Sequence, residues 1–226
     1  MRKLLLLLLS CCFTLLLAAQ GMYELQKKNT REMKSLDSAG WDHMGFFVFN
    51  VNQAALSNWS SGGERFLIGI NSIFNYSSHH RKGKFTKDSY LDLELGVVEA
   101  ASFKKFRKTT DRCDITVEME HSIDNSKLSY GLLFNFNSQL FGGHNYYIEG
   151  HNKISSFLSP GKILFAPGID FKNRNSRHYF SLFLSPATFR FVTKLDDEFH
   201  NQLKFGVDSA DKINTESVLI FRRIII

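Results

Sequence analysis

Apolar and polar residues alternate along much of this chain. In the clearest example, residues 128–140, Leu, Tyr and Phe fall on one side of an extended backbone, and Ser, Gly, Asn and Gln fall on the other, with Leu133 and Ser138 as the exceptions. A period of two residues indicates a β-strand. The stretch is longer than the average soluble strand of about five or six residues, and longer than the roughly 9–11 residues that cross a bilayer at a tilt. It is therefore long enough to span a membrane.

The same alternation recurs on both sides of this stretch and predicts an antiparallel meander. Short polar segments separate the expected strands, and the plainest turn signals are Ser-Ser-Gly-Gly before Glu64 and the basic run that begins at His79. We expect longer loops over residues 99–111 and 141–156. The expected strands are 45–53, 66–77, 85–97, 112–122, 128–140, 162–171 and 179–184, with weaker ones at 188–193 and 202–207.

The expected connections sort by length. Those after the second, fourth and sixth strands are short and polar, and the alternate ones are longer. Outer-membrane barrels sort their connections in this way, with short turns on the periplasmic side and long loops outside. The predicted fold class is all-β: an antiparallel up-and-down meander of the outer-membrane β-barrel type.

The first twenty residues have the character of a secretory signal peptide. Arg2 and Lys3 precede an apolar run that ends in small residues. Cys11 is an alternative lipoprotein acceptor, whereas ordinary cleavage leaves Cys113 as a lone thiol and predicts no internal disulfide. We expect a signal peptide over 1–20, a polar extension over 21–43, the meander domain over 44–207 and an atypical tail over 208–226. The expected location is the outer membrane, with the periplasm as the alternative.

Composition narrows the possible functions. The net charge of +6 is mild, and no Lys/Arg stripe interleaved with aromatics indicates a nucleic-acid partner. The sequence contains no Walker pattern, dinucleotide glycine pattern or G-x-S-x-G elbow. The eight histidines are scattered, without carboxylates or cysteines at ligand spacing. We therefore expect no enzyme activity, cofactor or metal site, and expect outer-membrane lipid and other envelope proteins as partners.

Two groups of residues are candidates for a functional role. The first is a loop motif that combines Trp with Gly-Gly, and it is interpreted either as a rim that contacts a ligand or as an interface anchor with a turn. The second is a set of carboxylates on the polar faces of the strands, interpreted as a cation-attracting lumen lining or as a salt-bridged barrel interior with Lys104, Lys105, Arg107, Lys108 and Arg112 as partners. The loop motif is Ser57, Asn58, Trp59, Gly62, Gly63 and Glu64; the lumen carboxylates are Asp92, Glu94, Asp114, Glu118, Glu120 and Asp170.

Several segments resemble a known family. They are WDHMGFFVFNVNQAALSNWSSGGE from Trp41, then FKKFRKTTDR, FLSPGKILFAPGIDF and the Leu-Ser-Pro at Leu184. Together they resemble the DUF3078 family of exported proteins of Bacteroidetes-type bacteria, over most of residues 41–206. The resemblance implies an outer-membrane β-barrel of unassigned function and no catalytic or ligand residues. The family usually continues for several more strands, whereas this chain ends in SVLIFRRIII, which indicates a C-terminal truncation.

The leading hypothesis is a non-enzymatic outer-membrane barrel that serves as a channel, a scaffold or a subunit of an envelope complex. The alternatives are a soluble periplasmic β-barrel that binds an apolar ligand and an outer-membrane lipid hydrolase. In either barrel hypothesis the C-terminal tail should supply the closing strand, yet Arg222 and Arg223 place a charge on each of its faces in succession. We therefore predict an open, incomplete sheet whose first strand lacks a closing neighbour from the C-terminal end.

Overall fold

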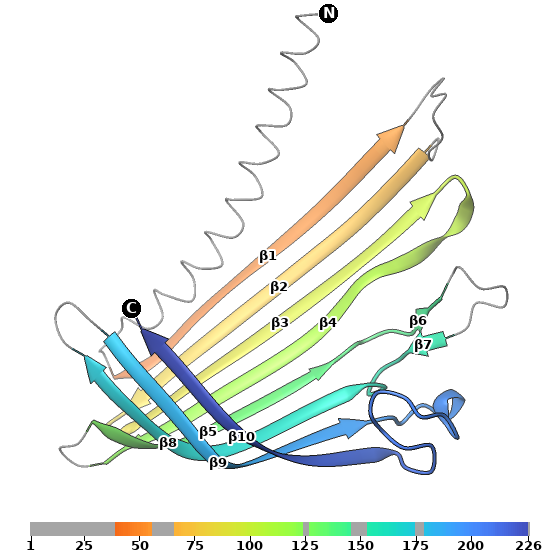
Figure 1. The fold of residues 1–226 in the computed structure, drawn as a ribbon. Coiled ribbons are helices and arrows are strands. Elements are labelled where there is room, and N and C mark those ends of the chain that lie inside the picture. Colours follow the sequence, from red (N-terminus) through yellow and green to blue (C-terminus); the bar gives the residue numbers. More distant parts are fainter. Residues whose placement is uncertain (1–38, 56–65, 124–126, 146–152, 175–178, 226) are drawn as a thin grey trace, which may run out of the picture.

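The computed structural model describes residues 39–55, 66–123, 127–145, 153–174 and 179–225. Eight strands form one antiparallel sheet in the order β1-β2-β3-β4-β5-β8-β9-β10, and β6 and β7 form a separate hairpin (Figure 1). The predicted all-β meander is confirmed. The strands are β1 Gly40–Ala55, β2 Phe66–Lys82, β3 Phe85–Ala100, β4 Phe103–Ser122, β5 Leu128–Ser138, β6 Gly143–His144, β7 Lys153–Ser155, β8 Gly161–Arg174, β9 Tyr179–Thr193 and β10 Ile213–Ile225.

The loop predicted over 99–111 is wrong. Strands β3 and β4 are joined through residues 101–102 alone, so the basic segment that follows is the first part of a 20-residue strand. An extra residue of β4, Thr109, interrupts the β3–β4 register opposite Gly96 and Val97, and this β-bulge breaks the alternation on which the prediction depended. The expected sorting of connections into a short end and a long end therefore fails at this hairpin.

Strand β9 corrects a second prediction. The sequence was divided at Pro186 into two strands, but one strand continues through it. The β8–β9 register shifts between Phe165 and Ile169, and the β9–β10 register shifts beside the same proline. A bulge is where an interior strand tolerates proline, because the extra residue is left out of the ladder. The Ser185 hydroxyl donates a hydrogen bond of 2.7 Å to the Pro167 carbonyl there.

The C-terminal part of the sheet also differs from expectation. Residues 202–207, predicted as a weak strand, contain only an isolated bridge between Lys204 and Val207, and a 3-10 helix, Asp197–Phe199, precedes them. The tail instead supplies β10, which pairs with β9 along most of its length. The predicted open sheet is confirmed: β1 and β10 are its two edges and do not pair. The C-terminal edge is therefore formed by the tail, which was expected to lie outside the meander domain.

The sheet is curved, and contacts between second-neighbour strands identify the inner side. Phe183 of β9 reaches across β8, so that a Cβ added to Gly131 of β5 would lie 2.8 Å from its ring. A Cβ added to Gly168 of β8 would lie 2.4 Å from a backbone oxygen of β9. Only glycine permits these close approaches. On the same side, Lys172 of β8 forms an ion pair with Glu120 of β4 across β5.

The outer face is apolar and exposed. Tyr130 of β5 is opposite Ile169 of β8, which is opposite Leu184 of β9. All three are exposed, Tyr130 to 62%. At the β1 edge, Phe47 is 64% exposed. The apolar face predicted for residues 128–140 is confirmed over β5, which ends at Ser138, and it continues as an outer surface over β1 to β9 that no other described segment covers.

No helix within the described ranges is both long and apolar enough to cross a membrane.

Candidate functional site

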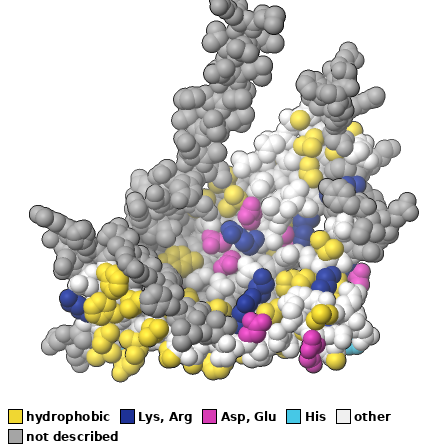
Figure 2. Space-filling model, in the orientation of Figure 1, with side chains coloured by type: hydrophobic (Ala, Val, Ile, Leu, Met, Phe, Trp, Pro, Cys, Tyr) yellow, Lys and Arg dark blue, Asp and Glu magenta, His cyan; other side chains and the backbone are white. Residues whose placement is uncertain are grey.

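The inner face of the sheet carries a group of acidic and basic side chains. Figure 2 shows acidic and basic groups gathered over the middle of the curved sheet. Five of the six carboxylates predicted for the lumen lie on this face of β3 and β4, because Asp92 is opposite Asp114 and the others occupy even positions of the same two strands. The sixth, Asp170 of β8, lies on the same face, where it contacts Lys172. The alternation of apolar and polar residues assigned each carboxylate to one side of its own strand. The β3–β4 register shows that for these two strands the sides are the same face of the sheet.

At the centre of this face, two carboxylates lie side by side. Asp92 of β3 and Asp114 of β4 are cross-strand partners, an arrangement in which like charges repel. Asn75 donates to Asp92, and Asn135 and Asn137 donate to Asp114 at 2.9 and 3.0 Å. Neutral amides therefore hold both carboxylates, and neither has a cationic partner among the described residues.

Three further acids on this face are paired with bases. Glu94 lies 4.0 Å from Arg112, and Lys172 pairs with both Glu120 and Asp170, the latter at 3.3 Å. Of the five basic residues proposed as partners, Arg112 is therefore within ion-pair distance of Glu94. The side chains of Lys104 and Lys105 lie outside the described residues. Lys172, which the sequence reasoning missed, is separated from Glu120 by 52 positions and is brought to it only by the register.

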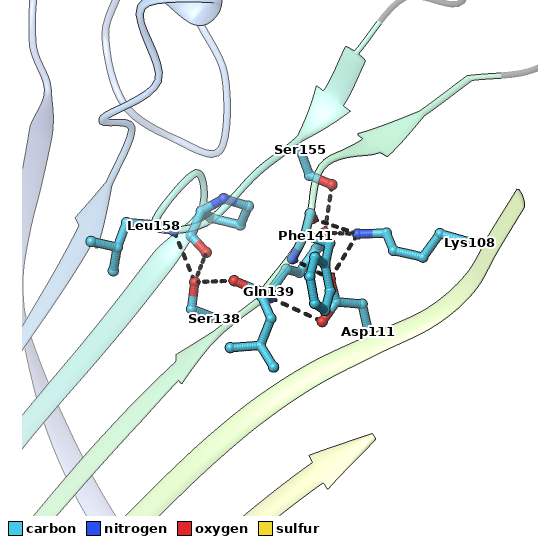
Figure 3. Close-up of polar contacts among 9 residues, drawn as sticks. Lys108, Asp111, Ser138, Gln139, Phe141, Ser155 and Leu158 are labelled. Carbon is cyan, nitrogen blue, oxygen red and sulfur yellow. Dashed lines mark hydrogen bonds and ion pairs between the residues drawn. The ribbon is translucent and has the colours of Figure 1, made fainter. Parts of the chain in front are cut away.

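A second polar network stands at the end of the sheet where β5 leaves it (Figure 3). The Lys108 ammonium contacts the Asp111 carboxylate at 3.0 Å, the Gln139 side-chain oxygen at 2.9 Å and the Phe141 carbonyl at 2.8 Å. Asp111 also accepts the backbone N–H groups of Leu140 and Phe141 at 2.9 and 2.7 Å. This buried ion pair therefore fixes the path of the chain after β5. It was missed because the segment was expected to be a loop.

The connection between β9 and β10 is ordered by a further ion pair. Lys153 of β7 lies 2.5 Å from Asp196, whose carboxylate also caps the 3-10 helix by accepting the Glu198 N–H at 3.0 Å. The hydrogen bond from Lys153 lowers the pKa of Asp196 to about 2. Nearby, the buried Lys194 ammonium donates to two backbone carbonyls, those of Gln202 and Asp208, at 2.7 and 2.8 Å.

The chemistry available at these sites is electrostatic. Within the described residues, no group of three or more His, Cys, Asp or Glu side chains is placed to hold a metal ion. Because Asp92 and Asp114 have no cationic partner within the described part of the chain, the inner face offers negative potential and amide groups to a mobile cation. The loop motif from Ser57 to Glu64 lies outside the described residues.

Family comparison matches residues 51–144 to the model described as a protein of unknown function, DUF3078. This segment belongs to the DUF3078 family. The match lies within the stretch over which the sequence resembles the family, and it confirms that prediction for β2 to β5 and their flanks. No curated protein and no solved structure matches the chain.

The DUF3078 segment contains most of the polar groups described above. Asp92, Asp114 and their three asparagine donors all fall inside it, and so do Lys108 and Asp111. The bulged strand β9 and the edge strand β10 fall outside it. The acidic pair and the buried ion pair are therefore features of the matched segment of the sheet.

Proposed function

We propose that this chain is a non-enzymatic wall element of the bacterial outer membrane, with lipid against its outer face and water against its inner face. Its role is passive, as a channel wall, a scaffold or a subunit of an envelope complex, and involves no covalent chemistry. The signal peptide expected at residues 1–20 would direct the export that this location requires.

One observation carries the proposal: the outer face exposes large apolar side chains along the full width of the sheet. Phe47, Phe49 and Val51 of β1 are each more than half exposed, and Phe165 and Phe189 continue the surface on β8 and β9. Soluble monomers rarely expose contiguous apolar patches larger than a few hundred Å². Lipid contact removes the cost of such a surface.

Strand length supports the same conclusion. The eight strands of the main sheet have between 11 and 20 residues. Each equals or exceeds the roughly 9–11 residues that a tilted strand needs to cross a bilayer. The polar inner face with its unbalanced acids is also the pattern of a water-filled lumen, which here would favour cations over anions.

The open edges set a condition on this function. Strands β1 and β10 each present one side without a ladder partner among the strands that the structure describes. An unsatisfied backbone group in hydrocarbon costs several kcal/mol, so both edges must be covered by further protein strands within the membrane. The proposal therefore includes closure through additional pairing.

Membrane fractionation tests the proposal. The expressed protein is expected in the outer-membrane fraction and is expected to remain there after an alkaline carbonate wash, because lipid contact along the sheet does not depend on charge. A periplasmic control protein should be washed out under the same conditions. Recovery of the folded chain in the soluble fraction without detergent would reject the proposal in favour of a soluble protein.

A further inference from the structure

An aromatic and histidine cluster lies on the outer face at the end of β1 to β3 nearest the turn at residues 83–84. The rings of Trp41 and His43 stack with centroids 5.6 Å apart, and the Trp41 ring lies 4.2 Å from that of His80. The Tyr76 hydroxyl lies 2.8 Å from His43 Nδ1. Trp41 remains 59% exposed. These rings are arranged against one another at the surface and are not part of a core.

The strand register adds two lysines to this cluster. Trp41 is opposite His80, which is opposite Lys87, so these three residues form one row across β1, β2 and β3. In the next row toward the turn, Lys82 is opposite Phe85. Directly opposed residues share a face of the sheet. Neither Lys82 nor Lys87 forms a hydrogen bond or ion pair with another described residue, so both ammonium groups are available to a ligand.

The position of the cluster along the strands matches the headgroup layer of a bilayer. Between Tyr76 and Ile68 the outward residues of β2 and their partners on β3 are largely apolar. Eight residues at about 3.3 Å each, tilted by about 40°, give this band a height of about 20 Å, against about 25 Å for an outer-membrane barrel. By the same geometry the Trp41–His80–Lys87 row lies roughly 10 Å beyond the Tyr76 end of this apolar band, among the headgroups.

We propose that Trp41, His43, Tyr76, His80, Lys82 and Lys87, the Trp41 cluster, form a binding site for the phosphate headgroup of an anionic membrane lipid. The two ammonium groups provide charge-assisted contacts to phosphate oxygens. The indole and imidazole N–H groups provide further donors, and the aromatic rings contact the upper part of the acyl chains. The inference rests on the proposed membrane location and adds to it a ligand class and a fixed immersion depth.

Tryptophan fluorescence in vesicles tests the site. The chain contains two tryptophans, so Trp59→Phe leaves Trp41 as the single reporter. In vesicles, phosphatidylglycerol brominated near the headgroup should quench Trp41 more strongly than the same lipid brominated near the chain end. It should also quench more strongly than headgroup-brominated phosphatidylcholine, because the site prefers an anionic lipid. Soluble glycerophosphate should not compete at matched phosphate concentration, because it lacks the acyl chains.

Two variants separate the site from general membrane association. Replacing Lys82 and Lys87 by alanine should weaken the preference for the anionic lipid roughly fivefold for each lysine removed. Lys212→Ala, which removes an exposed lysine near the opposite end of the sheet, should leave the preference unchanged. Flotation with vesicles but no anionic preference, or a preference that survives the double substitution, would overturn the lipid site alone. Failure to float with vesicles at all would overturn the proposed function and the lipid site together.

Discussion

Arginine substitution at two adjacent positions of β5 separates the two faces of the sheet. Phe134 lies on the outer face opposite Val117 and Phe165, in the middle of its strand. Asn135 lies on the inner face and donates hydrogen bonds of 2.9 Å to both the Asp114 carboxylate and the Thr116 hydroxyl. The two positions share one backbone, so only the environment of the side chain differs.

The expected costs follow from these environments. In a bilayer, Phe134→Arg should lower the free energy of unfolding by about 2–4 kcal/mol, the cost of an arginine on the lipid face near the midplane. Asn135→Arg loses two hydrogen bonds but places a cation beside the uncompensated Asp114, so its net cost should stay within about 1 kcal/mol. If the outer face were in water, Phe134→Arg would cost about 0.5 kcal/mol or less, as for most surface substitutions.

Reversible urea unfolding from phospholipid vesicles, followed by tryptophan emission, measures both values. The two variants serve as controls for each other, since both add an arginine side chain to the same strand. Equal costs at the two positions would refute the alternation of faces, and a negligible cost at Phe134 would refute lipid contact.

Three further predictions concern packing and the loop-bearing end of the sheet. Gly168→Ala should cost about 1–3 kcal/mol by overpacking against a backbone oxygen 2.4 Å from the new Cβ, while Gly69→Ala, with no atom nearer than 4.0 Å, should be tolerated in the same unfolding assay. Asp111→Ala should leave the strands intact but expose the chain after β5 to limited proteolysis, and uncut protein would contradict its anchoring role. Because the pKa of Asp196 is lowered to about 2 by Lys153, its stabilising contribution should be complete above about pH 4 and lost as the pH falls to 2. Asp196→Asn should abolish that acid-dependent change, and an unchanged profile would contradict the assignment.

The strands that the sequence predicted correctly share one physical feature. In β5, one apolar face and one polar face impose a period of two on the sequence. This period is visible whichever strands β5 pairs with. The period fails where the backbone departs from it. The bulge at Thr109 of β4 and the register shift at Pro186 of β9 disturb the alternation, and each was interpreted as an interruption of a strand.

The candidate site was predictable only in part for a related reason. Alternation placed Asp92 and Asp114 on polar faces, but their amide donors and the Lys172 partner of Glu120 depend on how distant strands align. The same limit applies to the Trp41 cluster, since Trp41 and His80 are far apart in sequence and become neighbours through the β1–β2 register. No spacing rule within one segment reports such contacts.

The proposed membrane function requires lipid on the outer face of the sheet and water on the inner face. Nitroxide spin labels placed singly at positions 130 to 137, in a Cys113→Ser background and in vesicles, measure collision with lipid-soluble oxygen and with a water-soluble nickel complex. We expect oxygen accessibility to peak at the even positions and nickel accessibility at the odd positions, so that the maxima of one profile coincide with the minima of the other. Nickel accessibility at both sets of positions, or no alternation, would contradict a sheet with lipid on its outer face and water on its inner face.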